Sequence, residues 1–305
     1  MQIIRGTAEF QIGEETAAAI GKFDGIHRGH QALLSHILRK KEEGKRAAVF
    51  TFDPPASVFF GRNEKELTTL REKRSFFERL GIDILIEFPL NKQTAAIPAQ
   101  EFVRRILAGQ MRTVYLAAGE DVSFGDKGMG NRELLERLAP GYGCQVEIIP
   151  KVFQEGREIS SSCVREEVLR GRMENAAGLL GRSYSVSGTV EQGKKLGRRL
   201  GMPTLNLYPD EDKLLPPNGV YFSRVLFQEK SLYGTTNIGT KPTVNDTPAL
   251  SVETYLYDYE GDLYGREITV ELLHLRRPEM KFRDVSELRE QMERDIRAGR
   301  NFHKI

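Results

Sequence analysis

Hydrophobic and polar positions follow two different rhythms in the two halves of the chain. In the first half, short apolar runs of strand length alternate with segments whose apolar residues recur at helical spacing. Alternation of this kind predicts an α/β unit with a parallel sheet covered by helices. The expected strands are 17–20, 45–52, 82–88, 113–118 and 144–150, and the expected helices are 30–38, 70–80, 98–108 and 131–138.

Two local signals sharpen this expectation. The helix at 98–108 begins with a proline, is followed by Gly109, and carries one apolar face. The loops after Ile20, Phe52 and Ala118 follow the carboxyl ends of strands. Ligands of parallel sheets bind at that edge, so we expect these three loops to share one crevice.

The second half is richer in β-structure. Two short helices are expected at 163–170, with Ser162 as N-cap, and at 173–180. From Ser183 to Leu275, short β-runs are separated by Gly, Pro, Asn and Asp, a spacing that favours a small antiparallel barrel. The clearest strands are 219–227, 231–238, 251–257 and 266–275, and the turn at 259–262 is expected to join the last two as a hairpin.

A terminal helix is predicted at 285–297. Asp284 and Glu287 resemble a capping box, and an apolar stripe follows at helical spacing, which we expect to pack against the barrel. The change of character near Ser183 predicts two domains, 1–182 and 183–305. The stripe consists of Val285, Leu288, Met292 and Ile296.

Composition narrows the functional class. The 305 residues are 39% hydrophobic, and no apolar run approaches the roughly 18 residues of a membrane span. Two cysteines are too few for a disulfide framework, so a reducing cytoplasm is the expected compartment. Basic residues number 45 and acidic residues 43, a near balance that argues against nucleic-acid binding.

The first concentrated motif is the run 21–30, which reads GKFDGIHRGH. It connects an apolar strand to a helix. Glycines let the backbone approach a ligand, and the start of the helix offers N–H groups to phosphate oxygens. His27 and His30 can point the same way at the first helical turn and donate hydrogen bonds to a phosphate. The run therefore indicates a nucleoside triphosphate site, although each residue alone is more typical of an ordinary exposed turn.

A second motif lies at 188–206, where four glycines and four basic residues are concentrated in one predicted loop. Such a loop can wrap phosphates with its N–H groups, and Thr204 and Asn206 supply oxygen ligands of the kind that Mg²⁺ prefers. The alternative, a surface hairpin with solvated charges, is equally compatible with the charge and glycine content.

The spacing of the first motif resembles the signature of the nucleotidylyltransferase superfamily. Gly197-Arg198, the run 203–206, Val252-Glu253-Thr254-Tyr255 and the runs 262–265 and 277–282 resemble riboflavin kinases. Together with Gly119-Glu120-Asp121, Phe124-Gly125 and Ser160-Ser161-Ser162 with Arg165, nearly the whole chain resembles the bacterial bifunctional riboflavin kinase/FAD synthetases.

This resemblance implies a Rossmann-like FMN adenylyltransferase domain followed by a riboflavin kinase barrel. ATP and Mg²⁺ would serve both reactions, riboflavin and FMN would be substrates, and FAD would be the final product. Glu253 would be the base that activates riboflavin, although a strand glutamate alone usually just faces water, and His27 and His30 would stabilise the ATP phosphates of the first site.

The resemblance also assigns the other site residues. Thr204 and Asn206 match metal ligands, and Asp121 and Phe124 match the flavin-binding loop. The implied ATP and phosphate contacts are Gly21, Phe23, Asp24, Gly25, Gly29, Ser162, Arg165, Gly188, Gly193, Gly197 and Arg198.

Two positions depart from the family pattern, both in the first domain. Pro55 stands where the family usually has a histidine, and Val122 where an aromatic residue is common. An alternative function is therefore a riboflavin kinase whose first domain is weakened, or serves as a non-catalytic nucleotide sensor or regulator. A nucleic-acid-binding regulator is disfavoured, because both histidines are present and the expected helices carry mixed charge.

Overall fold

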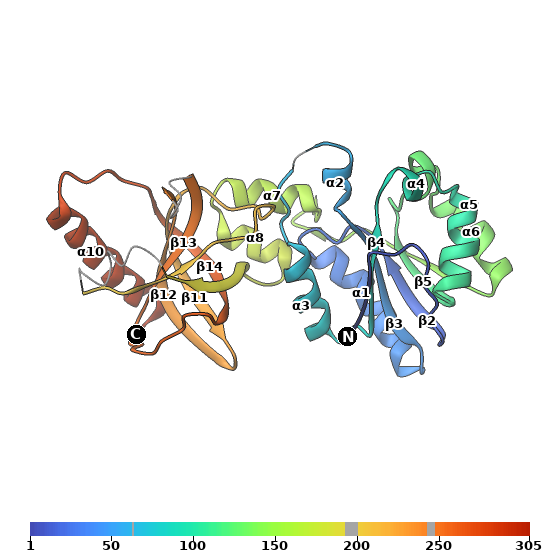
Figure 1. The fold of residues 1–305 in the computed structure, drawn as a ribbon, viewed down its shortest axis with the longest axis horizontal. Helices are drawn as coiled ribbons and strands as arrows, with labels where there is room; N and C mark the ends of the chain where they lie inside the picture. Colours follow the sequence, from blue (N-terminus) through green and yellow to red (C-terminus); the bar gives the residue numbers. More distant parts are fainter. Residues whose placement is uncertain (63, 193–200, 243–247) are drawn as a thin grey trace. The chain divides into compact units, whose positions relative to one another are not determined.

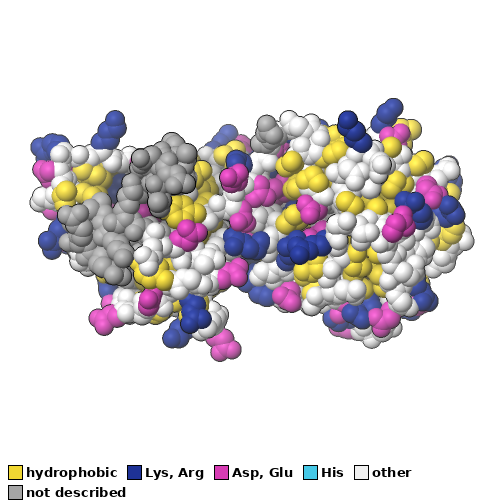
Figure 2. All heavy atoms as spheres, viewed as in Figure 1, with side chains coloured by type: hydrophobic (Ala, Val, Ile, Leu, Met, Phe, Trp, Pro, Cys, Tyr) yellow, Lys and Arg dark blue, Asp and Glu magenta, His cyan; other side chains and the backbone are white. Residues whose placement is uncertain are grey.

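A computed structural model describes residues 1–62, 64–192, 201–242 and 248–305 (Figure 1). Contacts divide the chain into two units, Met1–Ser161 and Ser162–Ile305, and each is described by itself. On the face shown in Figure 2, basic and acidic side chains are interspersed, in line with the near balance of charge.

The first unit is built on a six-stranded parallel sheet, as predicted. Its central strand, β2, is buried at every position and lies between β3 and β5, so the loops that follow these three strands leave from one edge. The short edge strand β1 has no clear apolar pattern in the sequence and was not expected. In sheet order the strands are β1 (Gln2–Arg5), β4 (Ile84–Pro89), β3 (Arg46–Asp53), β2 (Thr16–Ile20), β5 (Thr113–Gly119) and β6 (Gln145–Ile149).

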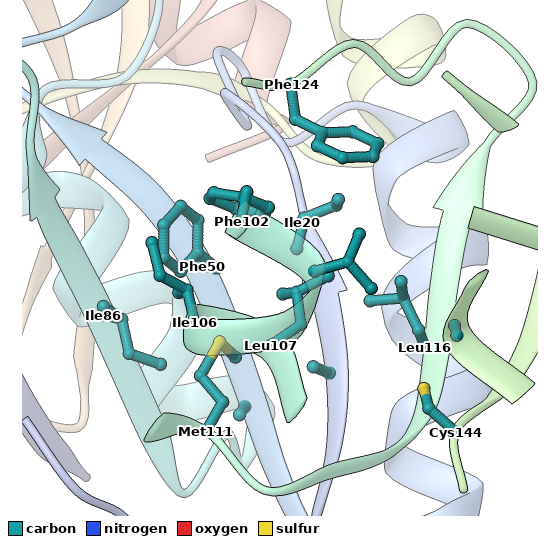
Figure 3. Close-up of a cluster of buried hydrophobic side chains, with 14 of the residues drawn as sticks. Ile20, Phe50, Ile86, Phe102, Ile106, Leu107, Met111, Leu116, Phe124 and Cys144 are labelled. Atoms are coloured by element: carbon teal, nitrogen blue, oxygen red, sulfur yellow. The ribbon is translucent and has the colours of Figure 1, made fainter. Parts of the chain in front are cut away.

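Helices cover both faces of this sheet. On one face, α1 (Arg28–Glu42) and α3 (Leu70–Leu80) bury Leu34, Ile37 and Phe77. On the other, η1 (Phe102–Gln110) and α6 (Arg132–Leu138) pack over Phe50 (Figure 3). The smaller elements are α2 (Ala56–Phe59), α4 (Lys92–Ala95), α5 (Ala99–Glu101), η2 (Asp126–Gly128), η3 (Ala139–Tyr142), β7 (Phe153–Gln154) and β8 (Arg157–Glu158).

The ends of two helices show when local sequence signals are enough to predict helix bounds. Helix α3 has the predicted bounds, because Thr69 and Glu72 form a capping box and Gly81 ends the helix in the left-handed region, at φ +88°. The helix expected at 98–108 instead continues past Gly109 to Gln110, as the π-helical segment η1. Its buried face extends to Gln110, so tertiary packing outweighs the low helix propensity of glycine.

The second unit contains a closed six-stranded antiparallel barrel, which confirms the predicted architecture. Helices α7 (Ser161–Leu169) and α8 (Met173–Leu180) precede it, and α8 contacts β9 and β14. Around the barrel the strands are β10 (Thr204–Leu207), β13 (Pro248–Leu256), β12 (Lys230–Pro242), β11 (Gly219–Phe227), β14 (Glu267–Pro278) and β9 (Tyr184–Glu191).

Two expectations for the second half were wrong. The predicted loop at 188–206 is shorter, because Gly188 lies inside β9 and Thr204 begins β10. The turn at 259–262 does not form a hairpin, because β13 pairs with β10 and β12, whereas β14 pairs with β11 and β9. Barrel closure, a long-range constraint, decides both outcomes.

The terminal helix α10 (Val285–His303) is longer than predicted. Asp284 caps it by accepting a hydrogen bond from the Glu287 N–H at 2.9 Å. The Glu287 carboxylate accepts from the N–H of Arg283 instead of that of Asp284, so the capping box is incomplete.

The last turn of α10 is held by aromatic contacts. The His303 ring stacks on Tyr233 with 4.3 Å between centroids, and Tyr257 and Phe302 pack around it edge-on. Burial lowers the pKa of His303, the positive charge of Arg224 lowers it further, and a hydrogen bond with the Gly234 backbone opposes the shift. The folded state therefore favours the neutral imidazole.

The lowered pKa predicts that acid weakens this packing. The unfolded chain takes up a proton at His303 below about pH 6.5, whereas the folded chain resists it, so the free energy of unfolding should fall as the pH drops through that value. His303→Phe keeps the stacking but cannot titrate. We expect the loss of melting temperature between pH 7.5 and pH 5.5 to be smaller in this variant than in the unmodified protein. Equal losses in the two proteins would contradict this role.

Candidate functional site

The two histidines, His27 and His30, lie at the end of the connection between β2 and α1 and in the first turn of α1. His27 is the N-cap of α1 and is 7% exposed, and its Nδ1 accepts a hydrogen bond from the His30 N–H at 3.4 Å. The two rings stack with their centroids 3.8 Å apart and an angle of 23° between planes. Because Nδ1 of His27 is an acceptor, the neutral ring carries its proton on Nε2, where it can donate to a phosphate oxygen.

The turn that precedes this pair has an unusual backbone. Phe23, Gly25 and Ile26 all have positive φ, at +49°, +79° and +42°. Glycine adopts this region at little cost, but phenylalanine and especially a β-branched isoleucine do so only when surrounding contacts impose it. At Gly29, an added Cβ would lie 3.1 Å from the His27 ring, so the absence of a side chain lets the ring sit against the first helical turn.

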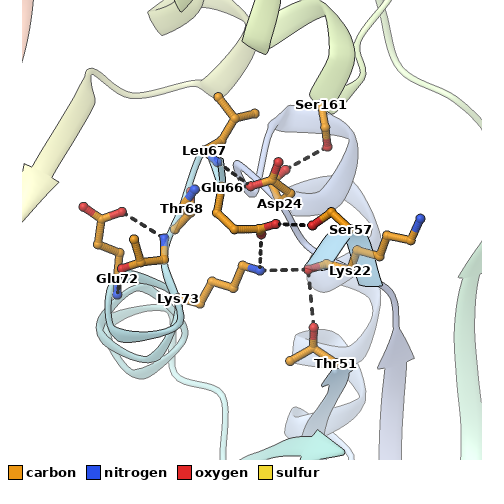
Figure 4. Close-up of polar contacts among 11 residues, drawn as sticks. Lys22, Asp24, Thr51, Ser57, Glu66, Leu67, Thr68, Glu72, Lys73 and Ser161 are labelled. Atoms are coloured by element: carbon orange, nitrogen blue, oxygen red, sulfur yellow. Dashed lines mark hydrogen bonds and ion pairs between the residues drawn. The ribbon is translucent and has the colours of Figure 1, made fainter. Parts of the chain in front are cut away.

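Three predicted ATP contacts in this turn, Gly21, Phe23 and Asp24, have defined structural contacts. Phe23 is fully buried and lies 5.2 Å from the His30 ring, and an added Cβ at Gly21 would come within 3.3 Å of the Phe23 ring. The Asp24 carboxylate accepts from the N–H groups of Leu67 and Thr68 at 2.7 and 3.2 Å (Figure 4). These contacts fix the conformation of the turn between β2 and α1.

The predicted flavin-binding loop follows β5, beside β2. Asp121 is exposed, whereas Phe124 is only 5% exposed and packs against Phe102 with 5.3 Å between centroids (Figure 3). Of the two departures from the family pattern, Val122 packs partly buried against the core, and Pro55 occupies the N-cap position of α2. The strands β3, β2 and β5 are neighbours in the sheet, so the loops that follow them leave from adjacent strands.

Ser162 and Arg165 lie on α7. The helix begins at Ser161, so Ser162 belongs to its first turn, and its expected role as N-cap was wrong. The Ser161 hydroxyl, one residue earlier, donates to the Asp24 carbonyl at 2.9 Å. This contact lies within the first unit, of which Ser161 is the last residue.

Strand register brings the kinase-like residues together. Asn206 on β10 is paired with Glu253 on β13, and Thr204 is paired with Tyr255. Residues directly opposite each other in an antiparallel pair project to the same face of the sheet, and so do residues two apart on one strand. Thr204, Asn206 and Glu253 therefore share one face.

Two cavities meet at Thr204, which lines both. The smaller, of about 200 Å³, lies between the 203–206 run and the 259–264 connection. The larger, of about 290 Å³, contains Glu253 and is closed by residues of α10. Leu288, Met292 and Ile296 line this cavity, and Val285 is 57% exposed, so the apolar stripe of α10 forms the wall of a cavity instead of packing fully into the core.

Two carboxylates flank Asn206, because it is paired with Glu253 on β13 and with Glu191 on β9. Burial raises the pKa of Tyr208, and the nearby carboxylates of Glu253 and Glu191 raise it further. Among the described residues, no three His, Cys, Asp or Glu side chains form a metal cluster. Hydroxyl, amide and carboxylate oxygens are the ligands that a hard cation prefers, and Mg²⁺ bound to nucleotide phosphates would take its remaining ligands from the phosphates.

The other predicted residues of the second motif are placed differently. Gly188 is buried inside β9, where an added Cβ would lie 2.9 Å from Leu207, so its lack of a side chain serves barrel packing. Gly193, Gly197 and Arg198 lie outside the described residues.

Sequence reasoning missed the ion pair that borders the larger cavity. Arg277 on β14 donates to Asp295 on α10 at 2.8 and 2.9 Å, and Asp295 is 2% exposed. The sequence did offer a signal. Asp295 lies on the same side of the helix as the apolar residues 288, 292 and 296, and a carboxylate on an apolar face needs a partner when it is buried.

Comparison with known proteins assigns both halves. A family model for FAD synthetase matches residues 9–163, and one for riboflavin kinase matches residues 180–303. Bifunctional riboflavin kinase/FMN adenylyltransferases from Listeria monocytogenes and Escherichia coli are each 35% identical to this chain. The alignment with the Listeria protein covers 93% of this chain and 91% of that protein. The alignment with the Escherichia coli protein covers 99% of this chain and 98% of that protein.

A solved structure shares the architecture. A crystal structure described as a macrolide-efflux protein from Streptococcus pneumoniae is 27% identical and superposes with a TM-score of 0.84, over 98% of each chain. Within the described part of this chain, no helix has the length and apolar character needed to cross a membrane. The two family matches in this order, with likeness to the curated relatives over nearly the full length, show that the chain belongs to the bifunctional riboflavin kinase/FMN adenylyltransferase family.

Proposed function

We propose that this chain phosphorylates riboflavin to FMN and then adenylylates FMN to FAD, with ATP as the donor in both reactions. Residues 183–305 carry the kinase and residues 1–182 the adenylyltransferase. The observation that carries the proposal is the pairing of Asn206 with Glu253 beside two cavities that meet at Thr204. Two adjoining pockets, one of them lined by the Glu253 carboxylate, suit phosphoryl transfer from a nucleotide to an alcohol.

In the kinase, the larger cavity would take the flavin ring and the smaller one the nucleotide. Apolar side chains such as Met280, Phe282 and Leu288 suit the isoalloxazine, and Glu253 lines the same cavity. The Glu253 carboxylate accepts the proton of the ribityl 5′-hydroxyl while that oxygen attacks the γ-phosphorus and ADP leaves. General-base help of this kind contributes about 10²–10⁴ in rate.

Mg²⁺ is the proposed cation of the kinase site. When bound, it neutralises charge on the transferring phosphates. The Thr204 hydroxyl and the Asn206 amide oxygen would hold it, with the ATP phosphates as further ligands. The pairing of Asn206 with Glu253 on one side and Glu191 on the other supports a cation at this place. The loop containing Gly193, Gly197 and Arg198 is proposed to wrap the phosphates.

In the adenylyltransferase, no general base is needed, because the attacking group is the ionised phosphate of FMN. An FMN phosphate oxygen attacks the α-phosphorus of ATP, and pyrophosphate leaves. His27, His30 and the N–H groups at the start of α1 stabilise the charge that develops on the phosphate oxygens. Ser162 and Arg165 are proposed as further triphosphate contacts, and Asp121 and Phe124 as contacts of the flavin.

The alternative, a kinase with a non-catalytic first domain, is not favoured. The FAD synthetase match extends over residues 9–163, a segment that includes both Pro55 and Val122. The cytoplasm is the proposed compartment, because both Cys144 and Cys163 are free thiols. Purified protein given riboflavin and Mg-ATP should yield FMN and then FAD on chromatography of the flavins. FMN without FAD would favour the alternative, and no FMN would remove the kinase assignment.

Replacement of the proposed base should separate the two activities. Glu253→Gln keeps the shape of the side chain but cannot accept the proton, so FMN formation should slow by about 10²–10⁴. Adenylylation of supplied FMN should stay unchanged. Glu267→Gln, at an exposed strand glutamate on β14, is the matched control and should leave both rates intact. A Glu253→Gln protein that makes FMN at the normal rate would contradict the assignment.

The reverse separation is expected at the histidine pair. His30→Ala removes a donor to the phosphates and should slow FAD formation from FMN by about 100-fold or more, the cost typical of losing a transition-state donor. Riboflavin phosphorylation should be unaffected. His36→Ala, on the same helix but paired with Glu147 at 2.9 Å, is the control. Loss of both activities in a folded His30→Ala protein would refute the assignment of two separate sites.

A further inference from the structure

A buried ion pair contacts the turn that precedes the two histidines. Lys73 on α3 and Glu66, in the segment before it, have side chains that are 3% and 7% exposed, and their Nζ and Oε2 atoms are 3.2 Å apart. Charges are rarely buried without a partner, because removing them from water is costly. The pair lies among the loops at the carboxyl edge of the sheet (Figure 4). Buried ion pairs often stabilise a protein no more than apolar side chains of similar volume would, so the specific contacts of this pair are what distinguish it.

Those contacts converge on the nucleotide turn. Besides Glu66, the Lys73 ammonium donates to the backbone carbonyl of Lys22 at 3.2 Å, and the Thr51 hydroxyl donates to the same carbonyl at 3.3 Å. Glu66 in turn accepts from the Ser57 hydroxyl of α2 at 3.0 Å. One buried cation thus connects the turn after β2, the helix after β3 and the segment before α3.

The carbonyl that Lys73 binds belongs to the strained part of the turn. It precedes Phe23, the first of the three residues with positive φ that lead to His27. Such a conformation persists when the surroundings fix the peptide groups on either side. A charge-assisted hydrogen bond from a buried ammonium is stronger than one between neutral groups, and it orients the Lys22–Phe23 peptide.

We propose that Lys73 is a positioning residue for adenylyl transfer: its ammonium group, balanced by Glu66, fixes the left-handed turn that places His27 and His30 against the triphosphate. The inference rests on the proposed function of the first unit. Lys73 itself is buried and bonded to protein atoms, so it acts through the turn and not on the reacting phosphate.

The test compares three lysine variants. Lys73→Met keeps the length and the apolar stem but removes the charge, and kcat/KM for FAD formation should fall about 100-fold, the cost typical of misplacing catalytic groups by about 1 Å. Lys73→Arg keeps a charged donor and should recover most of this loss. Lys41→Met is the matched control, since Lys41 also bonds one carboxylate and one carbonyl, Asp83 and Gly81, each at 2.8 Å, but is 43% exposed. It should leave FAD formation intact.

Amide hydrogen exchange separates positioning from loss of the fold. In Lys73→Met, peptides covering 21–27 should exchange faster, while those of β2, β3 and β5 keep their protection and riboflavin phosphorylation stays at the normal rate. Faster exchange throughout the sheet would show a purely structural role and overturn the proposal, as would unchanged FAD formation. Thr51→Val removes the second donor to the Lys22 carbonyl and leaves the charges of Lys73 and Glu66 unchanged. FAD formation should fall several-fold in this variant. An unmodified protein that makes no FAD would refute the proposed function instead.

Discussion

The geometry of the first site depends on one turn of backbone held in the left-handed region. Between β2 and α1 the chain must change direction within a few residues, and Phe23 and Ile26 accept positive φ to do so. Contacts from three other segments make this possible: Lys73 and Thr51 bind the Lys22 carbonyl, and the backbone of Leu67 and Thr68 binds Asp24. The stacked histidines are a consequence of that turn, because His27 caps the helix that it begins.

In the second site, the register of the paired strands positions the functional side chains. No strained backbone is required, since Asn206 and Glu253 face each other across two regular strands. The cavity beside them exists because α10 lies over the barrel with its apolar stripe directed inward, anchored by the Arg277–Asp295 pair. A helix that packed directly on the strands would leave no room for a ring system.

Local signals in the sequence were enough for much of the fold. Thr69, Glu72 and Gly81 set the ends of α3, and the apolar runs located β2 to β6 to within a few residues. Two kinds of feature were missed. The strands β1 and β10 are short and have weak apolar patterns, and the separation of β13 from β14 is set by barrel closure, a long-range constraint. The motifs identified the histidines and Glu253, but the contact between Lys73 and Lys22 joins positions 51 residues apart that no spacing rule connects.

The strand orders also bear on how the chain can fold as it leaves the ribosome. Strand β1 is made first, yet its pairing partner is β4, where Gln2 meets Ile84. In the barrel, β9 is made first and pairs with β10, the next strand, through Val190 and Glu191, but its longer pairing, over residues 184–189, is with β14, the last strand. At roughly 5–20 residues per second, β1 waits several seconds for β4, and β9 waits about as long for β14. Each unit thus completes its sheet only when its late strands emerge, and until then β1 is unpaired and β9 has a partner along one edge alone.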